Sequence, residues 1–253
     1  MVIPKRSIFL QGANLGALLM LIVVNALANI LPLNGKTTAE ISDSYPNLFT
    51  PAGYVFSIWG LIYALLLIFA VYQALLSQRE KTFLHKIGFF FVLSCIANIS
   101  WIFLWHYEQI ILSLALMFVL LITLIVIYLR LNIGRSDASL KERLYVHLPF
   151  SVYLGWITVA PIANVAAALT AINWDGWGIS DVTWTILVII IAMIITLSVI
   201  ITRKDIAFSL VIVWALIGII IKQIENQNIV ITASISAAII MIALASRLVK
   251  IKG

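Results

Sequence analysis

The sequence has 253 residues, of which 63% are hydrophobic and only 10% are charged. Soluble domains have about 45–50% apolar and about 25% charged residues, so this chain lacks the polar residues that would cover a water-facing surface. The composition excludes a soluble enzyme and a disordered chain, and the single cysteine excludes a disulfide-rich secreted domain. The net charge of +6 requires no nucleic-acid partner, because membrane proteins gather basic residues on their cytoplasmic side.

Apolar segments that are long enough to cross a bilayer follow one another along the whole chain. A helix needs roughly 20 such residues to span the hydrocarbon core. The runs are continuously apolar and do not alternate, so they predict an all-α polytopic membrane helix bundle with about eight transmembrane helices. The first run lacks a small-residue cleavage motif, and we interpret it as a retained span. The segments are 8–31, 52–77, 85–106, 109–131, 146–172, 182–202, 206–222 and 229–248.

The distribution of charge predicts how the chain crosses the membrane. With the N-terminus inside and eight alternating spans, 14 of the 16 basic residues fall on the inner side, and only Lys36 and Lys222 fall outside. The positive-inside rule then predicts a multi-pass protein of the cell membrane with both termini in the cytoplasm. No Asp, Glu, Lys or Arg lies in the middle of a span, which argues against a proton relay, a voltage sensor or an ion-coupled pump.

Polar and aromatic residues gather in the second and third spans. Thr50 before Pro51 is typical of an N-cap followed by a first-turn proline, so we expect the second helix to begin there. Trp59 and Tyr63 are four residues apart and share one helix face. The third span carries a stripe that must face protein or a cavity, although hydrogen bonding between helices would explain it equally well. This stripe consists of Ser94, Asn98, Trp101 and Trp105.

The fifth span places a large side chain, a small one and an amide on successive turns. Trp156, Ala160 and Asn164 would form a wall with a gap at the alanine. Pro161 removes a backbone hydrogen bond and would allow a kink there. The first span adds amides on roughly one face. Together these uncharged groups predict a pocket for a flat, largely apolar ligand with a few hydrogen-bonding groups. The first-span amides belong to Asn14, Asn25 and Asn29.

Three motifs in this order resemble those of the TspO/MBR family, which comprises the tryptophan-rich sensory proteins and the mitochondrial translocator protein. The segment 50–56, with Trp59 and Tyr63, resembles the proline- and tryptophan-rich signature at the start of that family's second helix. Asn98-x-x-Trp101 is similar to the third-helix motif, and Tyr153-Leu-Gly-Trp156 followed by Asn164 to the fifth-helix motif. The chain departs from the pattern at Ala52, where the signature has a second proline. It also has one residue fewer before Trp59 and lacks the fourth-helix aspartate within 112–131.

The resemblance implies a five-helix unit over residues 1–173. The three additional transmembrane helices over 174–253 depart from that unit, and we expect them to pack on it. It implies an integral membrane receptor or sensor that binds tetrapyrroles such as protoporphyrin IX, or related hydrophobic small molecules, without an obligatory cofactor. It implies no catalytic or metal-binding residues. Carried over position by position, the ligand-binding residues are Trp59, Tyr63, Asn98, Trp101, Trp156, Ala160 and Asn164.

Two other functions remain open at this point. A small-molecule transporter would use all eight helices, but the last three spans have few polar residues. A light-dependent porphyrin-degrading enzyme would use Trp156 as its redox-active side chain, and we regard catalysis as uncertain and less favoured. The expected partners are the lipid bilayer and a tetrapyrrole or other hydrophobic small molecule, with no nucleic acid. TspO-like bundles often pair, and small first-span residues would allow a homodimer. These are Gly12, Ala13, Gly16 and Ala17.

Overall fold

A computed structural model describes residues 5–31 and 33–252, with side chains over 7–31 and 33–247. It is 83% helical, and none of the described residues lies in a strand. Six of the described helical segments are long and apolar enough to cross a membrane, and two further apolar helices, α5 and α10, have 17 residues each. The predicted all-α membrane bundle is therefore confirmed.

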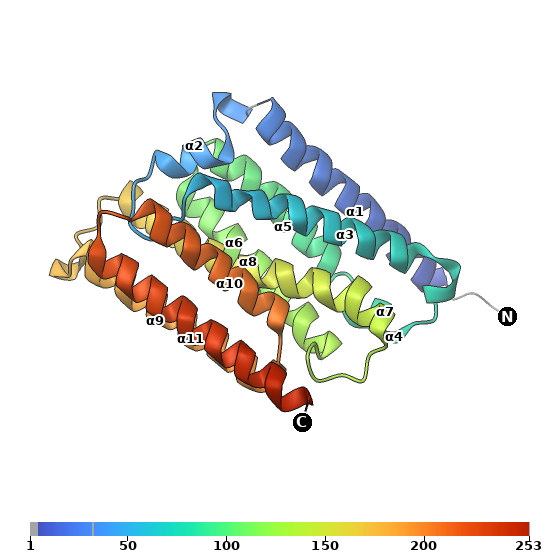
Figure 1. The fold of residues 1–253 in the computed structure, drawn as a ribbon. Coiled ribbons are helices and arrows are strands. Elements are labelled where there is room, and N and C mark those ends of the chain that lie inside the picture. Colours follow the sequence, from blue (N-terminus) through green and yellow to red (C-terminus); the bar gives the residue numbers. More distant parts are fainter. Residues whose placement is uncertain (1–4, 32, 253) are drawn as a thin grey trace.

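The long helices run up and down through one bundle (Figure 1). The first of them begins, and the last ends, at the end of the bundle that lies opposite the short helix α2 (Thr38–Asp43). This arrangement agrees with an even number of passes. The long helices of the described chain are α1 (Lys5–Ile30), α3 (Ile58–Ala74), α5 (Phe90–His106), α6 (Ile110–Leu131), α8 (Leu148–Ala171), α9 (Asp181–Arg203), α10 (Ile206–Lys222) and α11 (Gln227–Lys252).

The contacts between helices divide the bundle into two neighbouring groups. In the first group, α5 lies between α1 and α6, and α8 packs against α6 and α3. In the second, α9, α10 and α11 pack on one another, and α10 joins this group to α8. Gly155 permits that approach, because a Cβ there would lie 3.0 Å from the carbonyl oxygen of Phe208. Helix α10 therefore connects the last three helices to α8.

The start of the second membrane helix differs from the prediction. The N-cap expected at Thr50 is wrong: the 3₁₀ helix η2 (Gly53–Ser57) leads into α3, and its N-cap, Ala52, makes no side-chain capping bond. The hydroxyl of Thr50 instead donates to Oδ1 of Asn47 at 3.0 Å, inside the preceding loop. Local side-chain bonds of this kind compete with helix capping, and here the asparagine three residues earlier takes the hydroxyl.

Other local differences concern breaks and short helices. The expected span 85–106 is interrupted, because α4 (Thr82–Ile87) ends at Gly88, whose φ of +54° a residue without a Cβ adopts readily. Helix α8 runs unbroken through Pro161. The loop between α1 and α3 contains α2, which begins with a reciprocal capping box between Thr37 and Glu40. The remaining short elements are η1 (Leu33–Gly35), η3 (Leu76–Gln78), α7 (Leu140–Glu142), η4 (Arg143–His147) and η5 (Gly176–Gly178).

Candidate ligand-binding site

An aromatic cluster centred on Trp59 lies where α3, α5 and α8 meet. The Trp59 ring stacks on Tyr63, with centroids 5.6 Å apart, and on Trp101 at 6.2 Å. It meets Trp156 edge to face at 6.1 Å, and Tyr153 in the same manner and at the same distance. Such arrangements contribute about 0.5–1.5 kcal/mol per pair beyond the burial of the rings. Residues that are 97 positions apart in the sequence thus form one contiguous aromatic surface.

A small, partly open cavity lies against this cluster. Its volume is about 30 Å³. A buried water needs roughly 10–15 Å³ measured in this way, so the cavity has room for about two waters in the observed conformation. No charged side chain is among the described residues that line it. They are Thr38, Ser42, Pro51, Phe56, Trp59, Trp101, Trp105, Met117, Trp156, Val159, Ala160, Ala163 and Asn164.

A larger, more open cavity of about 480 Å³ lies on the other side of Phe56 and Trp59. It is formed by α1, α2 and α3, and Tyr63 faces it together with Asn25 and Asn29. Phe56, Trp59 and Thr38 line both cavities. The two aromatic side chains therefore lie between the small cavity and a groove beside the first helix.

The amides on α5 and α8 have different roles. Asn164 accepts a hydrogen bond from Nε1 of Trp101 at 2.9 Å and donates to the hydroxyl of Ser113 at 3.2 Å, so it fixes one indole of the cavity wall. Asn98 accepts from the amide of Asn25 at 3.0 Å and donates to the Tyr153 hydroxyl at 3.1 Å. These bonds tie α1, α5 and α8 together, which is the interhelical alternative considered for this residue.

Three buried polar atoms at the two cavities have no hydrogen-bond partner among the described residues. They are Nε1 of Trp156, the hydroxyl of Tyr63 and Oγ1 of Thr38. Most buried polar groups in proteins are hydrogen-bonded, so unpartnered ones need an explanation such as a bound molecule. Each of these residues lines a cavity, so a ligand that entered with some rearrangement of the walls would meet hydrogen-bonding groups without partners.

The structure brings together most of the residues predicted for the site. Trp59, Trp101, Trp156, Ala160 and Asn164 line the small cavity. Tyr63 lines the adjacent larger cavity. Asn98 lies behind the aromatic wall and contacts it through Tyr153. Ala160 is the small residue of α8 at the cavity surface, where the sequence predicted a gap.

The loop between α1 and α3 covers this end of the bundle and is held there by charged and polar contacts. Lys36 pairs with Glu108 at 2.9 Å, and the hydroxyl of Tyr45 donates to the same carboxylate at 3.1 Å. These two hydrogen bonds hold the pKa of Glu108 below its usual range, so the carboxylate stays ionised at neutral pH. Nε1 of Trp105 donates to the carbonyl of Thr38 at 3.2 Å, which fixes α2 over the small cavity.

Helix α10 supports the segment that leads into α3, a role that the sequence interpretation missed. The carbonyl of Gly218 accepts from the backbone N–H of Ala52 at 3.1 Å. Nε1 of Trp214 donates to the carbonyl of Val55 at 3.2 Å, and its ring meets Tyr54 edge on at 5.3 Å. The sequence offered one signal of this support: Gly218 follows Trp214 by one turn on an apolar helix.

The comparisons with known proteins agree with this architecture. A family described as "TSPO-like protein" matches residues 11–246. The chain belongs to this family. The match runs through all of the long helices, including α9, α10 and most of α11. Membership supports a multi-pass membrane protein of the ligand-binding or transport type. Searches of curated proteins and of solved structures found no match.

Proposed function

We propose that this TSPO-like protein is a receptor or sensor that binds a tetrapyrrole such as protoporphyrin IX, or a related hydrophobic small molecule, at the Trp59 cluster. The observation that carries the proposal is the unpartnered indole N–H of Trp156 in an uncharged aromatic cavity. Aromatic walls suit a flat apolar macrocycle, and a few polar atoms would fix its orientation. The tetrapyrrole is then a ligand, and the proposal includes no obligatory cofactor.

Binding of a macrocycle requires Phe56 and Trp59 to move. The small cavity of about 30 Å³ is far smaller than the roughly 300–1,000 Å³ of drug-sized ligand pockets, whereas the neighbouring cavity of about 480 Å³ falls within that range. Displacing these two side chains would merge the two spaces and expose the Trp156 N–H to the ligand. The buried polar atoms without hydrogen-bond partners at both cavities support this open state.

A transporter that uses all eight helices has less support, because α9, α10 and α11 contribute no lining residue to either cavity. A light-dependent degrading enzyme would use the same cavity, with Trp156 next to the macrocycle. Flux into proteoliposomes would distinguish a transporter from a receptor. Loss of the porphyrin Soret absorbance in light would distinguish a degrading enzyme.

The proposal is tested by titrating the full-length protein in nanodiscs with protoporphyrin IX in the dark and following tryptophan fluorescence. We expect saturable quenching at micromolar concentrations, with no loss of porphyrin absorbance. Protein-free nanodiscs mixed with free tryptophan provide the background. Quenching that rises linearly with porphyrin and scales with the amount of lipid would show simple partitioning and would contradict the proposal.

We also propose that both termini face the cytoplasm of a cell membrane. The start of α1 and the end of α11 lie at the same end of the bundle as the loop 132–139. Most of the basic residues of the sequence also belong to segments at that end. Cysteine-accessibility labelling in intact cells should modify a cysteine placed at Gly35 and leave one placed at Ser139 unlabelled until the membrane is permeabilised. Labelling of the second position in intact cells would reverse the orientation.

The division into units and the oligomeric state are further parts of this proposal. Residues 1–173 would form the ligand-binding unit, and 174–253 would buttress it through α10. A homodimer would use the exposed face of α1, where nothing lies within 4 Å of a Cβ at Gly12 or Gly16. A disulfide between copies carrying Gly12→Cys would support this dimer, and a monomer under oxidising conditions would count against it.

A further inference from the structure

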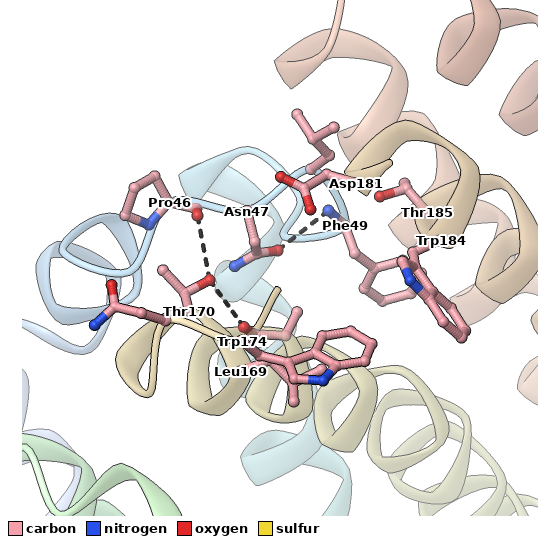
Figure 2. Close-up of a pocket in the computed structure, with 12 residues that line it drawn as sticks. Pro46, Asn47, Phe49, Leu169, Thr170, Trp174, Asp181, Trp184 and Thr185 are labelled. Atoms are coloured by element: carbon pink, nitrogen blue, oxygen red, sulfur yellow. Dashed lines mark hydrogen bonds between the residues drawn. The ribbon is translucent and has the colours of Figure 1, made fainter. Parts of the chain in front are cut away.

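A third cavity, of about 280 Å³, opens at the outer end of the bundle. It lies between the loop 46–49, the end of α8 and the start of α9, and none of its lining residues belongs to the candidate site. Figure 2 shows Asp181 at the top beside Asn47, Thr170 to the left, Trp184 to the right and Trp174 below. The cavity is therefore a separate place in the fold, and it does not depend on the proposed function.

The described side chains that line this cavity carry only negative charge. Asp181 is its single acidic residue, and none of the described lining residues is Lys, Arg or His. The two lysines at this end of the protein are engaged elsewhere, Lys36 with Glu108 and Lys222 with Asp43 at 2.8 Å. Asp181 forms no ion pair within the described part of the chain. The positive end of α9 offsets about half of its charge, which leaves the opening negative.

Two of the other polar groups around the opening are already occupied. Oδ1 of Asn47 accepts the N–H of Phe49 at 3.1 Å, and the Thr170 hydroxyl donates to the carbonyl of Ala166 at 3.0 Å. The Asp181 carboxylate is exposed and is the charged group that remains available to a ligand. A single carboxylate offers too few oxygen atoms for Ca²⁺, which takes six to eight, so a metal ion is a poor fit.

The apolar side of the cavity is aromatic and fixed in place. The rings of Trp174 and Trp184 are 5.5 Å apart and tilted by 50°. Nε1 of Trp184 donates to the carbonyl of Gly176 at 3.0 Å, so this indole is held in place. Tryptophan faces attract cations, and they favour ammonium groups that carry alkyl substituents over strongly hydrated ones.

We propose that this outer cavity binds an alkylated ammonium group, with the cation next to Asp181 and its alkyl groups against Trp174 and Trp184. Such a group has two sources, the choline headgroup of a phospholipid in the outer leaflet or a free quaternary ammonium compound. Both place a permanent, weakly hydrated positive charge beside a carboxylate and two indoles. An aromatic belt at the membrane surface would explain the tryptophans, and the first turn of α9 accommodates the carboxylate, but neither accounts for the cavity between these residues and the loop.

The test uses the full-length protein in phosphatidylglycerol nanodiscs, titrated calorimetrically with tetraethylammonium, with empty nanodiscs subtracted. We expect saturable binding that the same concentration of sodium does not displace. Asp181→Asn should weaken it about tenfold, equivalent to about 1.4 kcal/mol. Trp184→Phe should weaken it several-fold. The matched control is Asp175→Asn, which removes a charge from the same outer segment but outside the cavity, and it should change the affinity less than twofold.

Further measurements distinguish a folding defect from a loss of binding, and a choline headgroup from a free quaternary ammonium compound. Asp181→Glu retains the charge and should restore most of the affinity that Asp181→Asn loses, which a folding defect would not allow. Loss of tetraethylammonium binding in phosphatidylcholine nanodiscs would identify the lipid headgroup as occupant, and equal binding in both lipids would identify a free compound. Absence of saturable heat in phosphatidylglycerol, or equal weakening by Asp175→Asn and Asp181→Asn, would overturn the proposal.

Discussion

Ala160→Phe is expected to abolish saturable porphyrin binding while the helix bundle stays folded. Ala160 lies on α8 at the surface of the small cavity and is only partly buried, so a phenyl ring there would fill the space that the ligand needs. Trp156 lies one turn earlier and is 2% exposed, and the new ring would cover its unpartnered N–H. Dark titration of tryptophan quenching in nanodiscs measures the effect.

The control for this substitution places the same ring on the same helix away from the cavity. Ala171 is exposed at the end of α8, and Ala171→Phe should bind porphyrin as the unsubstituted protein does. If position 160 were ordinary core, the added ring would overpack it at a cost of about 1–3 kcal/mol and lower the thermal midpoint. Unchanged porphyrin affinity in Ala160→Phe would contradict the proposed site.

The residues that the sequence placed correctly share a simple physical signal. Trp59, Trp101 and Trp156 are large amphipathic side chains inside apolar helices, and helical spacing assigns each to one face. A face that carries an indole and an amide has few stable environments in a lipid bilayer other than protein, which is why the helices that carry them could be expected to meet. The periodicity of one helix does not, however, specify its distance from another.

What the sequence could not predict depends on contacts between segments far apart in the chain. Asn98 and Asn164 look equivalent in the sequence and both bridge helices, yet only Asn164 fixes an indole of the cavity, because their partners come from different helices. Likewise, Thr50 resembled an N-cap until the loop placed Asn47 beside it. The size of the cavity depends on the rotamers of Phe56 and Trp59, which no local pattern determines.

Gly218→Ala should destabilise the protein by about 1–3 kcal/mol, the usual cost of overpacking a close contact. A Cβ at this position of α10 would overlap Cγ2 of Val55 and lie 2.9 Å from Cβ of Pro51. It would also push away the Ala52 N–H that donates to the Gly218 carbonyl. Because this contact holds the segment leading into α3, we expect weaker porphyrin binding together with a lower thermal midpoint.

A comparison with Gly60→Ala makes the expectation specific. Nothing lies within 4 Å of a Cβ at Gly60, so alanine there should gain up to about 1 kcal/mol from its higher helix propensity. The same chemical change should thus raise the thermal midpoint on α3 and lower it on α10. In the Gly218→Ala background, Val55→Ala removes the overlapping methyl groups and should recover part of the loss, which a double-mutant cycle measures as coupling. If the two glycine substitutions shift the midpoint equally, or if no coupling with Val55 is found, α10 does not position the start of α3.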